Sequence, residues 1–254
     1  MKHWARLNIS TKDALSLDIK EHCFANTDKS DVYIPDHGGI WTFGKDIFND
    51  AWVDYVQETC PHLTVTGALV FWRTPNYQHP GAHIDVAPIS SPSRVEGVEY
   101  ENTFHAANSS DSMDKEDFYQ VVSSYNFVLD EGDDSAMTWY TPKKNSAEDL
   151  LELKKFESIH YDEVPLEKLN EVDRCTIGHD NLVMARTNVL HNVHMGNQER
   201  WAVCVRCIMN WSSWDEAVET MKPWIVKPKE FGGPTGAEPT RFNTWEVKGR
   251  EIDF

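Results

Sequence analysis

The sequence has few positive charges for its length. Its 254 residues include 24 lysines and arginines against 41 aspartates and glutamates, which gives a formal net charge of −17 with neutral histidines. Phosphate backbones and anionic lipid surfaces repel such a chain. Duplex nucleic acid and membrane surfaces are therefore poor partners for this protein.

Long apolar runs are also missing. The longest uninterrupted one, residues 67–72, is far shorter than the ~20 residues that span a bilayer. The first 18 residues contain neither a continuous apolar stretch nor a small-residue cleavage site, so they predict no secretory signal. We expect no membrane segment and a cytoplasmic location.

Cysteine is scarce, and its pattern excludes common uses. The five cysteines include one close pair, Cys204 and Cys207, and no second CxxC motif that would complete a zinc site. Positions three apart on a strand point to opposite faces. Reduced thiols are the simplest interpretation, and they agree with a cytoplasmic protein.

The rest of the composition is that of a globular protein. Hydrophobic residues make up 40% of the chain, charged residues 26%, and there are ten tryptophans. Without a repeat or a convincing linker, we expect one domain over residues 1–254. Its predicted parts are N-terminal helical support at 1–62, a β core with an acidic insertion at 63–210, and a C-terminal helix and tail at 211–254.

Hydrophobic periodicity predicts a mainly β fold with flanking helices. Amphipathic stripes indicate helices over 13–23 and 45–60, and Ser213 with Glu216 indicates a capped helix after the last strand. Residues 130–134 are typical of a hairpin turn. Many short strands without βαβ alternation favour an antiparallel sandwich or barrel of the jelly-roll, cupin-like kind. Runs rich in Val, Thr, Tyr and Trp predict strands at 64–72, 120–129, 136–140, 158–161, 182–190 and 200–209.

One pair of residues has the pattern of a metal site. His83 and Asp85 are two apart, so on a strand they point to the same face and converge on one point. Two imidazoles and one carboxylate form the facial triad of non-haem Fe(II) sites, which leaves positions open for substrates. His191, just after the predicted strand at 182–190, can supply the second imidazole. His194 and His179 are its alternatives.

Two arginines follow on the next predicted strand. Arg200 opens it, and a guanidinium fork there can bind a carboxylate through two hydrogen bonds. Arg206 is the alternative, because even spacing places both arginines on one face of the strand.

Together these residues resemble a known family. The segments HID at 83–85 and LHNVHMGNQERWAVCVR at 190–206 are similar to the HxD…H…R signature of the Fe(II)/2-oxoglutarate-dependent oxygenases. The segment at 126–140 resembles a hairpin found in some members. The resemblance covers residues 64–209 and implies a double-stranded β-helix. It also implies Fe(II) on His83, Asp85 and His191, and 2-oxoglutarate as co-substrate on Arg200.

The resemblance further implies a dioxygenase reaction. A hydroxylase acting on a C–H bond, with release of succinate and CO₂, is favoured because Asp85 fills the carboxylate position that related halogenases leave to halide. The substrate would be a small molecule or an amino-acid side chain. Asn126 could contact the co-substrate, and Tyr77 and Trp139 could contact the substrate.

Two other classes of protein fit the same residues. One is a cupin-like metal enzyme that does not use 2-oxoglutarate, and the other is a non-catalytic jelly-roll binding module. Charge adds one expectation about the ligand, since residues 84–174 hold 8 basic and 21 acidic residues. A solvated surface explains this surplus most simply. Alternatively, part of the segment lines the site and favours a cationic substrate.

Overall fold

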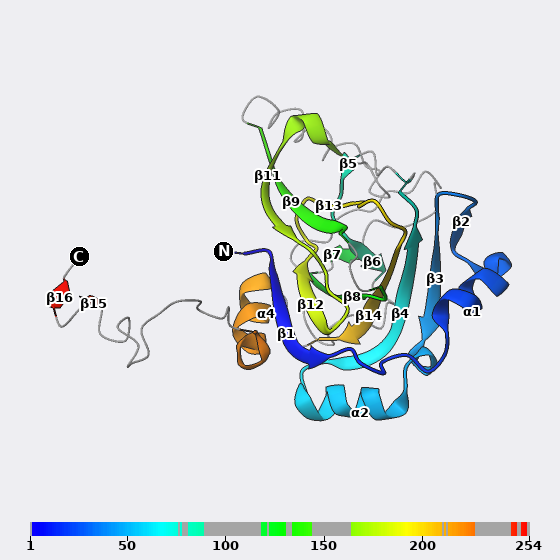
Figure 1. Ribbon diagram of the computed structural model, residues 1–254, viewed down its shortest axis with the longest axis horizontal. Helices are drawn as coiled ribbons and strands as arrows, with labels where there is room; N and C mark the ends of the chain where they lie inside the picture. Colours follow the sequence, from blue (N-terminus) through cyan, green and yellow to red (C-terminus); the bar gives the residue numbers. More distant parts are fainter. Residues whose placement is uncertain are drawn as a thin grey trace.

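The protein is mainly β, as its periodicity predicts. The structure is a computed structural model that describes residues 2–75, 77, 81–88, 118–120, 122–130, 134–143, 164–209, 211, 213–226, 245–247 and 250–252. The strand expected at 158–161 lies outside the described residues, and so does most of the acidic insertion. The described strands form antiparallel sheets, and Figure 1 shows them with the helices around them.

The larger sheet has seven strands, in the spatial order β1-β12-β8-β14-β4-β3-β2. All neighbouring strands in it run antiparallel. The strands are β1 Trp4–Ser10, β2 Val32–Ile34, β3 Gly38–Gly44, β4 Thr64–Arg73, β8 Ser123–Val128, β12 Asn181–Arg186 and β14 Arg200–Ile208. The predicted strands at 64–72 and 200–209 are thus confirmed almost to the residue, as β4 and β14.

A smaller sheet has the order β11-β9-β13, with β9 in the middle. These strands are β11 Leu169–Cys175, β9 Ala136–Pro142 and β13 His191–His194. Three further pairs of short strands complete the described β structure. They are β5 Gly81–Ala82 with β10 Val164–Pro165, β6 Val86–Pro88 with β7 Phe118–Gln120, and β15 Trp245–Val247 with β16 Arg250–Ile252.

Short helices lie around the sheets, and two have side-chain caps. The described α-helices are α1 Ile19–Ala25, α2 Asp50–Thr59 and α4 Trp214–Met221, and the 3₁₀ turns are Thr27–Lys29, Lys45–Ile47, Leu166–Lys168 and Lys222–Trp224. Asp18 accepts hydrogen bonds from the first turn of α1. The hydroxyl of Ser213 accepts from the backbone N–H of Glu216 at 3.2 Å, so the predicted cap is confirmed.

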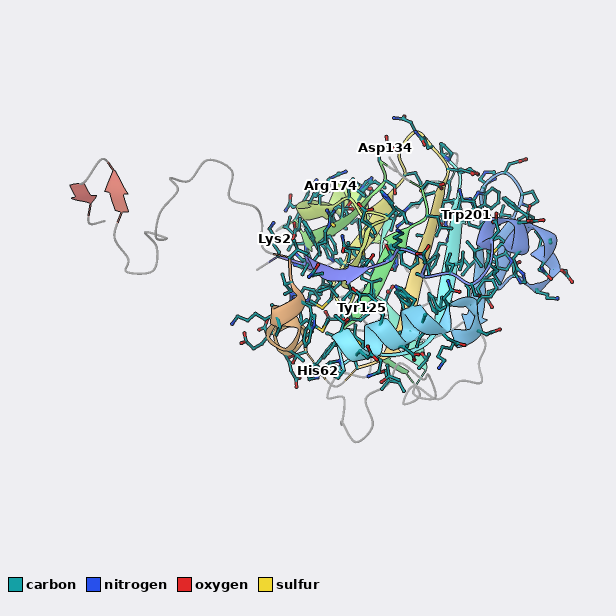
Figure 2. All side chains as sticks on the ribbon, turned by 60° about the horizontal axis from the view of Figure 1, so that its bottom comes forward. Lys2, His62, Tyr125, Asp134, Arg174 and Trp201 are labelled. Atoms are coloured by element: carbon teal, nitrogen blue, oxygen red, sulfur yellow. The ribbon has the colours of Figure 1, made fainter. Side chains whose placement is uncertain are left out.

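The two faces of the larger sheet have different neighbours. One face packs under the helices, where Trp201 and Val203 of β14 share a buried cluster with Val56 of α2 and Ala217 of α4. Figure 2 shows α2 lying across the strands on this side. On the other face, Ala202 packs against Trp139 of the smaller sheet. The two sheets therefore face each other, and alternate residues of β14 point to different cores.

The expectation of N-terminal helical support at 1–62 describes only part of that segment. Helices α1 and α2 form near the predicted stripes, but β1, β2 and β3 from the same segment belong to the larger sheet. Strand β1 could have been predicted, because its polar Arg6 and Asn8 alternate with its buried Leu7 and Ile9, which is the period of a half-buried strand. Strand β3 begins with two glycines, which are poor strand formers.

The predicted hairpin at 130–134 is also wrong. Strand β8 pairs with β12 and β14 in the larger sheet, whereas β9 pairs with β11 and β13 in the smaller one. The segment between β8 and β9 therefore connects the two sheets. The predicted strand at 182–190 similarly ends at Arg186, and the chain then crosses to β13.

The described residues contain neither a membrane-length apolar helix nor a disulfide. No helix among them is both long and apolar enough to cross a bilayer. All five cysteines are buried free thiols. Cys207 packs in the core under the helices, while Cys204 lies opposite Asn126 on β8, so the two thiols point to different faces of β14.

Truncating a buried side chain on the helix-covered face of the larger sheet should strongly lower the free energy of unfolding. Leu182 of β12 is fully buried, so Leu182→Ala should lower the free energy of unfolding by about 2–5 kcal/mol through lost contacts and a cavity. Leu17 is 38% exposed, and Leu17→Ala is the matched control with an expected change within about 0.5 kcal/mol. Urea denaturation measures both. Similar losses for the two variants would contradict this assignment of the core.

Candidate metal centre

Two histidines from distant parts of the chain meet across a β bridge. His83 follows β5, and His191 is the first residue of β13. The backbone N–H of each donates to the carbonyl oxygen of the other, both at 2.9 Å. Directly opposite residues of an antiparallel pair point to the same side. The two imidazole rings accordingly lie with their centroids 4.5 Å apart.

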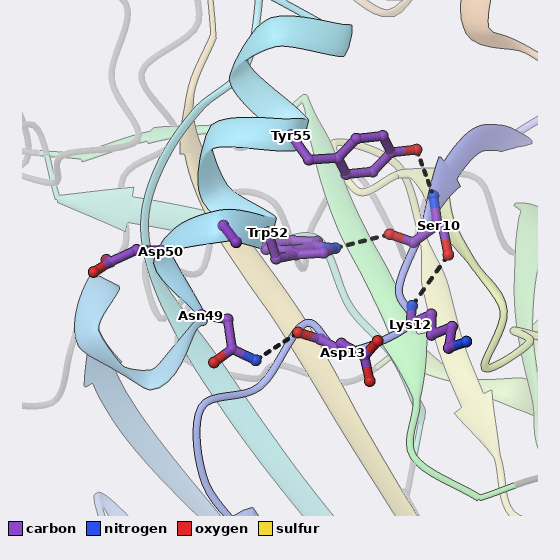
Figure 3. Close-up of a pocket in the computed structure, with 8 residues that line it drawn as sticks. Ser10, Lys12, Asp13, Asn49, Asp50, Trp52 and Tyr55 are labelled. Atoms are coloured by element: carbon purple, nitrogen blue, oxygen red, sulfur yellow. Dashed lines mark hydrogen bonds between the residues drawn. The ribbon is translucent and has the colours of Figure 1, made fainter.

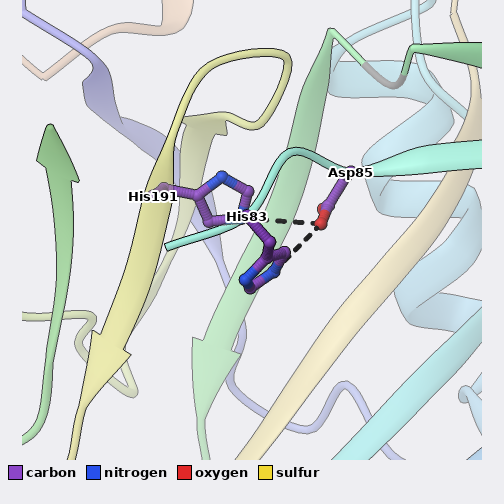
Figure 4. A group of neighbouring side chains, drawn as sticks. All are labelled: His83, Asp85 and His191. Atoms are coloured by element: carbon purple, nitrogen blue, oxygen red, sulfur yellow. Dashed lines mark ion pairs between the residues drawn. The ribbon is translucent and has the colours of Figure 1, made fainter. Parts of the chain in front are cut away.

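Asp85 joins the two imidazoles. Its backbone N–H donates to the carbonyl oxygen of Thr187 at 2.9 Å, which holds the segment after His83 beside the loop before β13. Its Oδ1 atom lies 3.5 Å from Nε2 of His83 and 3.5 Å from Nε2 of His191 (Figure 4). One ligand atom from each of the three residues lies within 4.8 Å of the others.

The surroundings of His191 and Asp85 suit the binding of a cation. His191 is only 3% exposed, and its Nδ1 lies 2.9 Å from the carbonyl oxygen of Val189. A proton on Nδ1 makes this a hydrogen bond and leaves the lone pair of Nε2 directed at Asp85. The Asp85 side chain is 36% exposed, so solvent reaches the cluster at the carboxylate.

The pKa values of His83 and Asp85 are both shifted in the direction that suits metal binding. Burial lowers the pKa of His83, and the neighbouring His191 lowers it further, so the His83 imidazole is neutral at pH 7. Burial alone would raise the pKa of Asp85, but the two histidines, His191 foremost, outweigh it and hold that pKa below its usual range. A neutral imidazole and an ionised carboxylate are the forms that bind a metal ion.

The arrangement is that of an incomplete coordination shell. Two imidazole nitrogens and one carboxylate oxygen on one side of a point can hold Fe(II) with three positions open. Three protein ligands with an open fourth position are also usual for catalytic zinc. The cluster can therefore hold a metal ion and leave room for a second ligand.

The other histidines considered from sequence lie elsewhere. The His194 ring contacts Tyr140, whose hydroxyl is 2.5 Å from Nε2 of His194, and His194 is three residues from His191 on the same strand. The side chain of His179 is 38% exposed, and its Nε2 is 2.9 Å from Asp180. Among the described residues, the three-residue cluster contains His83, Asp85 and His191, as the sequence predicts.

Arg200 and Arg206 lie on β14, in the larger sheet that faces the smaller one. Arg200 is 6% exposed at the start of β14, and Arg206 is half-buried six residues later. Cys204 lies between them on the same face. Burial raises the pKa of the Cys204 thiol, the charge of Arg206 and a hydrogen bond with it lower that pKa, and Asp85 raises it. Burial has the largest effect, so the Cys204 pKa is raised overall.

Asn126 lies near this part of β14. It is directly opposite Cys204 on the neighbouring strand β8, and it is half-buried. Its Nδ2 donates to the hydroxyl of Ser124 at 2.7 Å. Ser124 and Asn126 thus form a neutral polar pair beside Cys204.

The two aromatic residues expected near a substrate have structural contacts. Trp139 is fully buried opposite His191, and its indole N–H donates to the carbonyl oxygen of Arg186 at 2.7 Å. The guanidinium of Arg73 lies 4.4 Å from the centroid of the Tyr77 ring. Arg73 is directly opposite Arg200, so Tyr77 lies at the Arg200 end of β14.

A separate hollow lies between β1 and α2 (Figure 3). It is lined by Ser10, Lys12, Asp13, Asn49, Asp50, Ala51, Trp52 and Tyr55. Much of its polar surface is used internally, since the indole N–H of Trp52 donates to the carbonyl oxygen of Ser10 at 2.8 Å. Asn49 donates to the carbonyl oxygen of Asp13 at 2.6 Å. These contacts join the strand to the helix, and none of the metal-ligand candidates takes part.

Sequence reasoning did not identify the residues that support the cluster. Val189 orients His191, and Thr187 anchors Asp85, in both cases through a backbone carbonyl oxygen. Backbone acceptors leave no signature in residue type. Their closeness to His191 in the sequence is the signal that was available.

The C-terminal segment matches a family of its own. Residues 216–254 match the family described as a protein of unknown function (DUF1674). The match begins within α4 and includes none of the residues of the candidate metal centre.

The geometry predicts which histidine is a ligand. His191→Gln should weaken Co(II) binding at least about 100-fold, because losing even a supporting partner of a ligand costs about 10–100-fold. His194→Gln is the matched control and should keep the affinity within a few fold. Titration of the visible Co(II) absorption measures both, and equal losses would place the metal elsewhere.

Proposed function

We propose that the protein is an Fe(II)/2-oxoglutarate-dependent oxygenase with His83, Asp85 and His191 as its metal ligands. The observation that carries the proposal is the convergence of two imidazoles and one carboxylate, with Oδ1 of Asp85 3.5 Å from both Nε2 atoms. This donor set is the facial triad of non-haem Fe(II) enzymes that activate O₂. Fe(II) and 2-oxoglutarate together supply the oxidising chemistry for C–H hydroxylation when they are bound.

The order of the strands supports a double-stranded β-helix. Along the chain, β8 lies in the larger sheet, β9 and β11 in the smaller, β12 in the larger, β13 in the smaller and β14 in the larger. The chain thus alternates between two facing antiparallel sheets, which is the winding of a jelly roll. In such a fold the ligands come from the smaller sheet and face the inner side of the larger one.

In this proposal Arg200 binds the distal carboxylate of 2-oxoglutarate. It is buried on the inner face of β14, about 7 Å along the strand at ~3.3 Å per residue from Ala202, which shares a cluster with Trp139 opposite His191. An arginine side chain and a five-carbon diacid can bridge that length. The guanidinium fork matches a carboxylate through two hydrogen bonds.

The charge around Arg200 supports the binding of an anion there. Arg73 lies directly opposite Arg200, and its Nη1 donates to the carbonyl oxygens of Gly39 at 3.0 Å and Trp72 at 2.9 Å. Two arginines therefore lie side by side at the end of β14 where we place the distal carboxylate of 2-oxoglutarate.

The ligand set favours hydroxylation as the outcome. Asp85 fills the carboxylate position, so that position is closed to halide. The chain's own part is to hold the His83 imidazole neutral, to keep Asp85 ionised and to leave one side of the triad open for co-substrate and O₂. The same residues also suit a cupin-like metal enzyme without 2-oxoglutarate, and the dependence on Arg200 distinguishes that alternative.

The co-substrate assignment gives a spectroscopic prediction. Wild-type protein with Fe(II) and 2-oxoglutarate under anaerobic conditions should develop a visible metal-to-ligand charge-transfer band. Arg200→Gln should weaken 2-oxoglutarate at least about tenfold, because a hydrogen bond to a charged group contributes about 1.5–3 kcal/mol and 1.4 kcal/mol is tenfold. Its affinity for Co(II) should stay within a few fold.

One control variant and three contrary outcomes test this prediction. Arg174→Gln removes the same charge from an exposed residue that pairs with Glu171 at 2.8 Å, and it should keep the band. Absence of the band in the wild type, or its persistence in His83→Ala with Asp85→Ala, would refute the proposal. A metal-loaded protein that releases no succinate with any candidate substrate would favour the cupin-like alternative or a binding module.

A further inference from the structure

The inner face of β14 carries a second arginine beyond the one proposed for 2-oxoglutarate. Arg200, Cys204 and Arg206 are separated by even numbers of residues, so their side chains share the face on which Ala202 packs against the smaller sheet. Arg200 and Arg206 are about 20 Å apart along the strand at ~3.3 Å per residue. The two guanidinium groups are therefore carried at well-separated positions on this face.

The inner face of β14 also relates Arg206 to the metal centre. Ala202 shares a buried cluster with Trp139 of the smaller sheet, and Trp139 lies directly opposite His191. Because Arg200 lies two residues before Ala202 and Arg206 four residues after it, the two arginines lie on opposite sides of this point.

The neighbours of Arg206 are neutral. Asn126 lies opposite Cys204, and it is hydrogen-bonded to Ser124 on the same strand face. Within the described part of the chain, no carboxylate forms an ion pair with Arg206. A half-buried guanidinium beside a thiol, an amide and a hydroxyl is a suitable receptor for one negative charge.

We propose that Arg206 binds the carboxylate of the substrate, which is a small carboxylic acid such as a free amino acid. This inference rests on the proposed oxygenase function and divides the work between the two arginines. Arg200 binds the co-substrate, and Arg206 fixes the substrate on the other side of the metal. Asn126 and Ser124 are positioned to add neutral hydrogen bonds.

The chemistry favours a monoanion over a phosphate. A planar guanidinium matches a carboxylate through two parallel hydrogen bonds. The net charge of −17 repels polyanions, and one arginine with two neutral partners offers little compensation for a phosphate. A free amino acid also carries the cationic group that the acidic insertion would favour.

The test is a binding experiment that does not depend on turnover. Zn(II)-loaded protein with 2-oxoglutarate is mixed with the common L-amino acids and, separately, with their primary amides. Saturation-transfer NMR reports which of them bind. We expect at least one acid to bind and its amide to fail. Arg206→Gln should weaken that acid at least about tenfold, as expected for loss of a charge-assisted hydrogen bond.

Two controls separate this proposal from the previous one. Arg174→Gln removes an equal charge from an exposed site and should keep the affinity for the acid. Arg206→Gln should retain the anaerobic charge-transfer band with 2-oxoglutarate within about twofold of the wild-type affinity, whereas Arg200→Gln should not. An unchanged melting temperature for Arg206→Gln shows that the fold is intact.

Several results would overturn the assignment of Arg206. They are binding of no acid by the wild type, equal binding of acid and amide, or an unchanged affinity in Arg206→Gln. Loss of 2-oxoglutarate binding in Arg206→Gln would instead make it the co-substrate residue. A missing charge-transfer band in the wild type refutes the oxygenase proposal by itself, and the NMR comparison on Zn(II) protein still measures the contribution of Arg206.

Discussion

The candidate metal centre depends on one pair of backbone hydrogen bonds, those that join His83 and His191. The two residues are far apart in the sequence, and the segment between them includes strands of both sheets. Their reciprocal N–H···O contacts of 2.9 Å place both imidazoles on one side of the bridge. Asp85 lies two residues after His83 in an extended segment, and its backbone N–H donates to the carbonyl oxygen of Thr187. This contact brings the Asp85 carboxylate to the same point.

A second constraint is the alternation of side chains along β14. Trp201, Val203 and Val205 pack under the helices, while Arg200 and Cys204 point to the opposite face. A shift of one residue in the register would place arginines in an apolar core and tryptophan on the face that carries the candidate ligands. The large hydrophobic cluster therefore fixes the positions of the polar residues on β14. Strand β14 therefore contributes both to the hydrophobic core and to the face that carries the two arginines.

The sequence predicts the site better than it predicts the topology. His83 and Asp85 could be identified because their two-residue spacing carries direct geometric meaning, and His191 because it follows a predicted strand. Strands β4, β9 and β14 could be located because they are continuous runs of branched and aromatic residues. The register between distant strands has no local signal. The turn at 130–134 therefore looked like a hairpin, although the chain there crosses to another sheet, and β11 was missed because charged residues interrupt it.

The distribution of charge adds a constraint on what can approach the centre. The chain has a net charge of −17, yet the charged side chains on the inner face of β14 are both arginines, and Arg73 lies opposite the first of them. Arg200 is only 6% exposed, in a chain whose acidic residues outnumber its basic ones. In the proposed function, the acidic surplus would repel polyanions at long range, because that repulsion grows with the charge of the ligand, whereas a bidentate contact with an arginine would act locally on a single carboxylate.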